Sequence, residues 1–223
     1  MRPGGILLTE RALQLCSLRS GSRVIDVGCG AGETFKLLEG TGVSRLVGLD
    51  TSEPLLEEAH TRLESTQLVR GCAQTLPFKD LLFDALFCEC VLSILEDGTK
   101  ALLERVRVLR QGGYLILSDV FTKNGRSVRG LGHGSQPLPA KAPLVREDLL
   151  RLLEGLGFAV LLWEEHENLL KEFAARMILA GLRLPDSWCF GQEWKTRKGD
   201  GMKLSYFLLV GRKGETLASS IPG

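Results

Sequence analysis

The stretch VIDVGCGAGET, residues 24–34, decides the fold. It begins with a short apolar run that is typical of a buried strand, and it continues with an acid and three glycines at alternate positions. Glycine adopts backbone angles that other residues avoid, and it lets a ligand approach the main chain closely. The stretch therefore predicts a strand that turns sharply into a helix, with a ligand bound at the turn.

The spacing of the glycines argues against two common phosphate-binding turns. A dinucleotide fingerprint, GxGxxG, needs its third glycine at position 33, where this chain has Glu33. A Walker A motif is absent, because no GK[ST] follows the turn. Asp50 ends the next predicted strand, and a carboxylate there can accept hydrogen bonds from both hydroxyls of a ribose. The turn and Asp50 together indicate an adenosine-type ligand without the usual pyrophosphate seat.

Strand and helix patterns alternate along most of the chain, which indicates a parallel sheet covered by helices. We expect strands at 23–28, 45–50, 66–73, 83–88, 114–120, 159–166 and 204–213, and helices at 10–18, 33–42, 51–65, 98–113, 146–158 and 168–182.

We expect one domain over residues 1–213. Residues 121–143 are rich in Gly, Pro, Ser and basic residues without periodicity, which is typical of a lid or a substrate loop. Residues 214–223 are expected to form a flexible tail.

The composition narrows the choice of partners and compartment. The formal net charge of +1 over 223 residues gives no electrostatic reason to expect nucleic acid or an anionic membrane as partner. We find no secretory signal and no apolar run of the roughly 20 residues that would cross a bilayer. The six cysteines lack CxxC spacing, so we expect reduced thiols in the cytoplasm. A monomer or a homodimer fits these features equally.

Five segments between Arg23 and Asp119 resemble, in order, the core of class I S-adenosylmethionine-dependent methyltransferases. They are DVGCGAG, VGLD, GCAQTLPF, FDALFCECVL and LRQGGYLILSD. The segment LSYFLLVGRK also resembles the antiparallel seventh strand of that family, and RPGGILLTERAL resembles the first helix of its small-molecule members. The resemblance implies an α/β, Rossmann-like sheet of seven mostly parallel strands, with an antiparallel last strand and helices on both faces.

The resemblance also implies S-adenosylmethionine as cofactor and S-adenosylhomocysteine as product. Asp26 and the glycine turn would hold the methionine part, and Asp50 would hold the ribose, with Thr51 or Leu49 beside the adenine. Cys72 stands where the family often has an Asp for the adenine amino group, so that contact would shift to the next two residues. The implied cofactor-binding residues are Asp26, Gly28, Cys29, Gly30, Gly32, Asp50, Thr51, Cys72, Ala73, Gln74 and Cys88.

The function implied by the resemblance is methyl transfer to an unidentified, small-molecule acceptor. Because a sulfonium is a good leaving group, the protein's main contribution would be alignment, and a base is needed only when the acceptor must lose a proton. Glu89, which ends the fourth strand, is the candidate catalytic residue. Asp119 either faces the same rim or caps a loop, and His133 lies on the expected lid.

Two other functions stay open from the sequence. A non-catalytic S-adenosylmethionine-binding module would explain the atypical Cys72. An NAD(P)-dependent oxidoreductase would share the ribose-binding acid, although Glu33 and the missing Tyr-x-x-x-Lys pair count against it. We expect no metal site, although thiols at Cys72, Cys88 and Cys90 could bind a soft metalloid if the fold brought them together.

Overall fold

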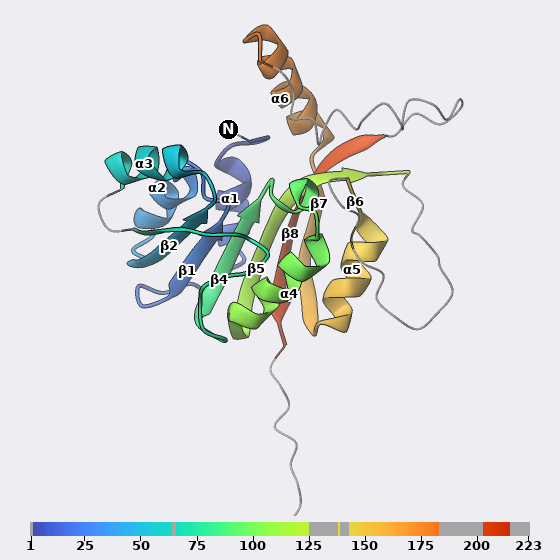
Figure 1. Ribbon diagram of the computed structural model, residues 1–223. Helices are drawn as coiled ribbons and strands as arrows, with labels where there is room; N and C mark the ends of the chain where they lie inside the picture. The colour runs from blue at the N-terminus through green and yellow to red at the C-terminus, as the bar shows by residue number, and fades with distance from the viewer. Residues whose placement is uncertain (1, 64–65, 125–137, 139–142, 183–202, 215–223) are drawn as a thin grey trace, which may run out of the picture.

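The computed structural model describes residues 2–63, 66–124, 138, 143–182 and 203–214 (Figure 1). Seven strands form an open sheet in the order β3-β2-β1-β4-β5-β8-β7, and a short β6 pairs with β5 beside this path. The strands are β1 Arg23–Val27, β2 Arg45–Asp50, β3 Gln67–Arg70, β4 Phe83–Glu89, β5 Leu109–Thr122, β6 Leu144–Val145, β7 Phe158–Glu165 and β8 Leu204–Lys213. The helices are α1 Leu7–Leu13, α2 Glu33–Glu39, α3 Glu53–Arg62, α4 Gly98–Val108, α5 Arg146–Gly155 and α6 Glu167–Leu179, with a 3₁₀ helix η1 Leu92–Ile94.

The sheet confirms the predicted α/β fold. β1 pairs in parallel with β2 and β4, and β4 pairs in parallel with β5. β8 is antiparallel to both of its neighbours, β5 and β7, as expected for the last strand of the pattern. The two-residue β6 was not predicted, because a segment that short carries no periodicity.

Helices cover both faces of the sheet, as predicted. On one face, apolar residues of α4 and α5 pack against the strands in a cluster that includes Leu102 and Leu149. On the other face, α1, α2 and α3 pack in a second cluster that includes Leu8 and Phe35. All seven residues of β4 are buried, which is typical of a central parallel strand covered on both sides.

The predicted end of the helix at 98–113 is wrong. α4 ends at Val108, and Leu109 already belongs to β5, where the pairing with β4 shifts register between Phe83 and Ala85. A β-carbon at Gly113 would lie 2.9 Å from the Arg110 carbonyl oxygen, so the two glycines allow this irregularity of the strand instead of ending the helix.

The first helix differs from the prediction, and the segment expected as a lid begins within a strand. α1 spans Leu7–Leu13 and not 10–18, because its buried face is made by Leu8, Thr9 and Ala12. The segment predicted as a lid, 121–143, begins with the last two residues of β5 and includes the buried Leu138. Residues 125–137 and 139–142 of that segment, and the tail from 215, lie outside the described residues.

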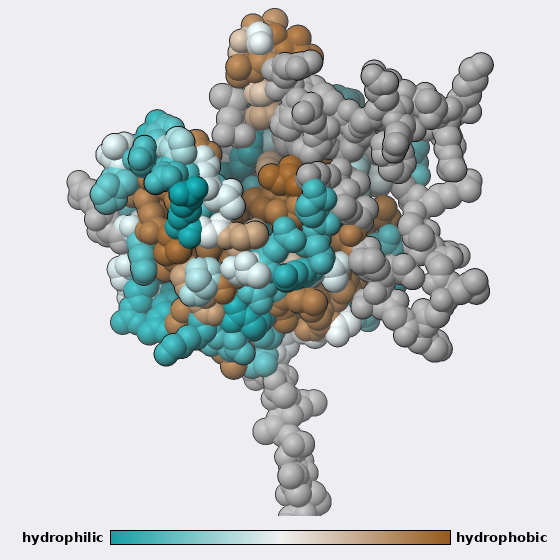
Figure 2. Space-filling view, in the orientation of Figure 1, coloured by the Kyte–Doolittle hydropathy of each residue, from teal (hydrophilic) through white to brown (hydrophobic). Residues whose placement is uncertain are grey.

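α6 projects away from the carboxyl edge of the sheet (Figure 1). Its outer end is apolar and exposed, with Ile178 at 65% and Leu179 at 87% exposure, and Figure 2 shows this end as a hydrophobic tip above the body. Within the described ranges, the structure contains no helix whose length and hydropathy would suit a membrane span.

Candidate functional site

Three acidic residues meet where three neighbouring strands end. Asp26 lies near the end of β1, Asp50 ends β2 and Glu89 ends β4. Because β1 lies between β2 and β4 and all three are parallel, their carboxyl ends share one edge of the sheet. The strand order reverses between β1 and β4, and ligands of open α/β sheets bind at such a switch point.

The glycine turn is fixed by hydrogen bonds from its backbone to β2. The amides of Gly28 and Cys29 both donate to the Leu49 carbonyl, at 2.7 and 3.1 Å. Gly28 has φ of +84°, and a β-carbon there would overlap Val91 Cγ2, so no other residue fits this position without rearrangement.

Asp50 is oriented by the same turn. Its Oδ2 accepts a hydrogen bond from the Gly30 amide at 2.8 Å, and its Oδ1 accepts one from the Ser52 amide at 2.9 Å. Each carboxylate oxygen has a second lone pair, so a half-buried Asp50 can still accept hydrogen bonds from the two hydroxyls of a ribose.

Glu89 lies at the centre of a buried polar cluster. Thr9 on α1 donates to its Oε1 at 3.1 Å, and Thr34 on α2 donates to its Oε2 at 3.0 Å. The guanidinium of Arg2 lies 2.9 Å from the same Oε2 and donates to Thr9 Oγ1 at 2.7 Å. The Glu89 side chain is 3% exposed, so this negative charge is held away from water by an ion pair and two hydroxyls.

The electrostatics of the cluster favour a cationic ligand. The pKa of Asp26 is raised to about 7, chiefly by burial and also by the negative charges of Glu89 and Asp50, while Arg2 and the Thr34 hydroxyl oppose the shift. Three carboxylates therefore compete for little positive charge at one edge of the sheet.

This donor set fits S-adenosylmethionine better than a dinucleotide. An ammonium and a sulfonium would relieve the repulsion among the buried acids, and Asp50 is free to bind a ribose. A pyrophosphate at the same turn would add negative charge beside Asp26 and Glu89, which the geometry opposes.

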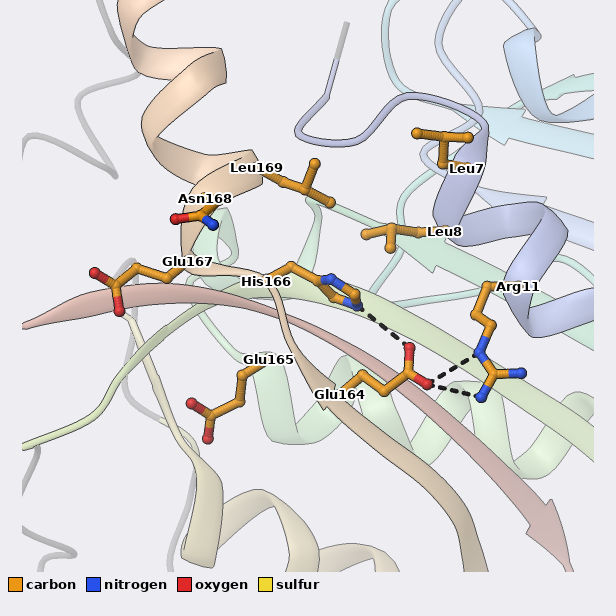
Figure 3. A pocket seen from close by; sticks show the side chains of 9 residues that line it. All are labelled: Leu7, Leu8, Arg11, Glu164, Glu165, His166, Glu167, Asn168 and Leu169. Atoms are coloured by element: carbon orange, nitrogen blue, oxygen red, sulfur yellow. Dashed lines mark hydrogen bonds and ion pairs between the residues drawn. The ribbon is translucent and has the colours of Figure 1, made fainter.

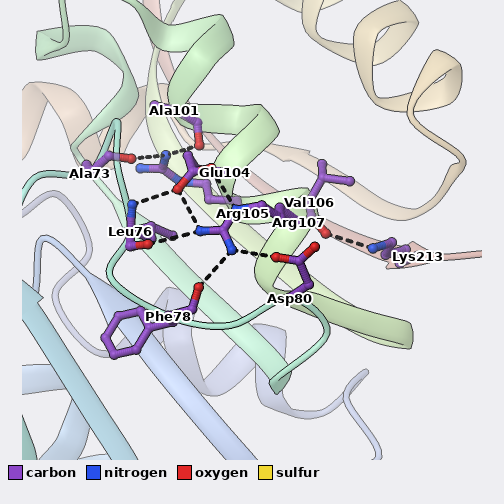
Figure 4. Close-up of polar contacts among 10 residues, drawn as sticks. All are labelled: Ala73, Leu76, Phe78, Asp80, Ala101, Glu104, Arg105, Val106, Arg107 and Lys213. Atoms are coloured by element: carbon purple, nitrogen blue, oxygen red, sulfur yellow. Dashed lines mark hydrogen bonds and ion pairs between the residues drawn. The ribbon is translucent and has the colours of Figure 1, made fainter.

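Helix α4 clamps the segment that follows β3, which carries the positions expected beside the adenine (Figure 4). Arg107 donates to the carbonyls of Leu76 and Phe78, at 2.9 and 2.7 Å, and to Asp80 at 2.7 Å. Glu104 accepts from the Leu76 amide at 2.7 Å, and hydrogen bonds from Arg107 hold the pKa of Glu104 below its ordinary value. The segment is thereby fixed at three backbone positions.

Arg105, which follows Glu104 on α4, is completely buried and faces the sheet. Its Nη1 donates to the carbonyls of Ala101 and Ala73, at 2.6 and 3.4 Å, and its Nη2 donates to Cys88 Sγ at 2.9 Å. Arg105 thus connects the end of β4 with the segment after β3.

The comparisons with known proteins agree with this geometry. The sequence profile of the methyltransferase domain family matches residues 25–117. A demethylmenaquinone methyltransferase of Staphylococcus aureus is 35% identical over 112 residues, which cover 48% of this chain and 46% of the relative. Both comparisons support a class I methyltransferase fold for the core of the chain, residues 25–117.

Solved structures share the fold of this chain. A geranyl diphosphate methyltransferase in complex with S-adenosylmethionine aligns with a TM-score of 0.72 at 15% identity, over 94% of this chain and 85% of that one. The [4+2]-cyclase SpnF aligns with a TM-score of 0.67 at 23% identity, over 93% of this chain and 80% of that one. The fold is therefore shared by proteins of different activity, and the chain spans less than half the length of the curated relative above.

The described cysteines do not form one cluster. Cys29 packs in the core against β2, whereas Cys72 is exposed and accepts a hydrogen bond from the Gln74 amide at 3.4 Å. Burial raises the pKa of Cys88 to about 11, although Arg105 lowers it in part.

Two other positions expected to bind the cofactor differ in exposure: Ala73 is buried and Thr51 is exposed.

Cys88 and Cys90 lie in the cores on opposite faces of the sheet. Cys90 has φ of +58°, and its thiol lies 2.9 Å from the Tyr206 hydroxyl. The residues that the structure describes contain no group of His, Cys, Asp or Glu that could hold a metal ion, and the geometry brings no thiol pair together for a metalloid.

Asp119 is buried and caps η1, the 3₁₀ helix that follows β4. Its two oxygens accept hydrogen bonds from the amide and the hydroxyl of Ser93 in η1, at 3.0 and 2.6 Å, and burial raises its pKa. His133 lies outside the described residues.

Sequence reasoning did not identify Arg2, Thr9 or Thr34 as members of the Glu89 cluster. Thr34 follows the glycine turn directly, so its place in the first turn of α2 was a usable signal. Arg2 and Thr9 are about 80 residues from Glu89 in sequence, and no pattern connects them.

A hollow of about 700 Å³ lies between α1 and the segment that joins β7 to α6 (Figure 3). Leu7, Leu8 and Arg11 line it from α1, whereas Thr9 points to the opposite side of that helix. Arg11 donates to Glu164 from two nitrogens, at 2.9 and 2.8 Å. None of the residues around the hollow belongs to the glycine turn or to the ends of β1, β2 and β4.

Proposed function

We propose that this protein is an S-adenosylmethionine-dependent methyltransferase that acts on a small-molecule acceptor and releases S-adenosylhomocysteine. The observation that carries the proposal is the junction of β1, β2 and β4, where Asp26, Asp50 and Glu89 surround a rigid glycine turn. The methyltransferase profile over residues 25–117 supports it.

Different residues of the site would bind different parts of the cofactor. Asp50 would hold the ribose, and Asp26 with the backbone of Gly28, Gly30 and Gly32 would hold the methionine part. The clamped segment that contains Cys72, Ala73 and Gln74 would face the adenine, with Thr51 on its other side. Cys29 contributes its backbone amide to the turn, because its side chain is buried in the core.

The chemistry needs alignment more than it needs a proton acceptor. When bound, S-adenosylmethionine supplies a methyl group on a positively charged sulfur, and the transfer is an in-line displacement. Glu89 is engaged by Arg2, Thr9 and Thr34, so its first contribution is a fixed negative charge at the end of β4. Its role as a base would require an acceptor that displaces one of these partners.

Cys88 would support the site from behind. Cys88 is 1% exposed and its thiol is hydrogen-bonded to Arg105, so the pocket wall at this position is formed by the end of β4 and not by a free thiol.

We place the protein in the cytoplasm as a monomer or homodimer, with no membrane or nucleic-acid partner. The free thiols among the described cysteines and the balanced charge support this placement.

Calorimetric titration of ligand-free protein with S-adenosylmethionine, and separately with S-adenosylhomocysteine, tests the proposal. We expect micromolar binding of both and a loss of at least tenfold in Asp50→Ala, because hydrogen bonds to a charged acceptor are strong. The matched control is Asp97→Ala, which removes an exposed helix cap of α4. The absence of binding in the unaltered protein would overturn the proposal.

A second candidate is a module that binds S-adenosylmethionine without turnover. The complete set of partners around Glu89 favours it, since Arg2, Thr9 and Thr34 occupy the carboxylate that would act as the base. Release of S-adenosylhomocysteine with any acceptor of a metabolite panel, measured by mass spectrometry, would exclude it.

A further inference from the structure

Arg2 is a cation placed inside a cluster of acids. Its side chain is 16% exposed, which is low for an arginine, and it reaches Glu89 and Thr9 through Nη2. Its Nε donates to the Gly5 carbonyl at 3.1 Å, which holds the guanidinium at a fixed angle. Nη1 has no hydrogen-bond partner among the residues that the structure describes.

The ligand of the proposed function has two charges of opposite sign at its amino-acid end. The ammonium suits the acids of the junction, but the carboxylate would meet Asp26, Asp50 and Glu89 as like charges. Like charges this close repel one another strongly, so a site of this kind needs a cation for the carboxylate. A guanidinium with unused donors is suited to that task, because its planar fork matches a carboxylate.

We propose that Arg2 determines the selectivity of the site for the amino-acid end of the cofactor by binding its α-carboxylate. Glu89 and Thr9 hold the guanidinium in place, and the free donors face the ligand. The N-terminal segment that precedes α1 is then part of the cofactor site. The inference rests on the proposed function.

Measuring the affinity of two ligands for two proteins isolates the interaction between Arg2 and the α-carboxylate of the cofactor. The ligands are S-adenosylmethionine and its decarboxylated form, which keeps the ammonium and the sulfonium but lacks the carboxylate. The proteins are the unaltered chain and Arg2→Gln. The matched control is Arg11→Gln, which removes an arginine from α1 that is also paired with a glutamate but lies at the far side of the helix.

We expect the unaltered protein to bind S-adenosylmethionine about 10- to 100-fold more tightly than the decarboxylated form, as measured by calorimetry. Arg2→Gln should reduce this ratio to about one, Arg2→Lys should give an intermediate ratio, and Arg11→Gln should leave it unchanged. The ratio matters more than either affinity, because the loss of the Glu89 partner changes both ligands alike.

Several results would overturn the inference. Equal binding of the two ligands by the unaltered protein would do so without any variant. An unchanged ratio in Arg2→Gln would mean that the carboxylate is held elsewhere. Tighter binding of both ligands by the same factor in Arg2→Gln would mean that Arg2 competes with the cofactor for Glu89. Failure of the unaltered protein to bind either S-adenosylmethionine or S-adenosylhomocysteine would instead remove the proposed function, and this inference with it.

Discussion

Replacing Gly28 by alanine should destabilise the glycine turn by two separable amounts. A residue with a β-carbon at φ of +84° costs about 1–2 kcal/mol relative to an ordinary backbone conformation. The new methyl group would also overlap Val91 Cγ2, and such overpacking typically costs about 1–3 kcal/mol. We therefore expect Gly28→Ala to lower the free energy of unfolding by about 2–5 kcal/mol.

Two further variants separate these contributions. Gly42 has φ of +80° with open space around its Cα, so Gly42→Ala should show the backbone cost alone, about 1–2 kcal/mol. Val91→Ala removes the atom that the new methyl group would meet, so the double variant Gly28→Ala/Val91→Ala should be more stable than the sum of the single changes by about 1–3 kcal/mol. Urea unfolding measures all four free energies. Equal costs at Gly28 and Gly42, together with additive effects at Gly28 and Val91, would refute the overlap.

Three other predictions concern single side chains. The pKa of Asp26 lies above its ordinary value in the folded chain, so the folded state keeps a proton that the unfolded state has released. The free energy of unfolding should therefore fall as pH rises from about 4 to about 7. Asp26→Asn should flatten that slope in urea titrations at several pH values. Asp119→Ala should lower stability by about 1–3 kcal/mol, because it leaves the amide of buried Ser93 without its acceptor, and thermal unfolding would show no change if the cap were dispensable. Cys72 is exposed, so Cys72→Ser should remove a fast-reacting thiol in a timed alkylation, whereas Cys88→Ser should leave the fast phase intact because that thiol is buried and bonded to Arg105.

Most of the fold could be predicted from the sequence, because its signals are local. Alternating apolar strands and helix patterns gave seven strands, and glycine spacing located the turn at 28–32. The end of α4 was predicted too late, since Gly112 and Gly113 stop helices and also allow irregular strands, and the choice depends on pairing with β4. Tertiary contacts decided that case.

The candidate site was predictable where a strand ended in an acid. Asp26, Asp50 and Glu89 could be placed together because parallel neighbours end at one edge. The partners of Glu89 could not be predicted, because Arg2 and Thr9 reach it from the N-terminal segment and α1, which are remote in sequence. The orientation of Cys88 was likewise decided by Arg105, whose burial no periodicity indicates.

The position of β8 has a consequence for how the chain folds during synthesis. β8 lies between β5 and β7, so β7 has no described partner strand until residues 204–213 have left the ribosome. Until then the edge of β5 that faces away from β4 has no partner in β8, and such unpaired edges can pair with other chains. The nascent protein must therefore protect that edge over about 80 residues of elongation, counted from the end of β5 to the start of β8 (204 − 122 = 82). Chaperone demand and aggregation of truncated chains are expected to be highest in this interval.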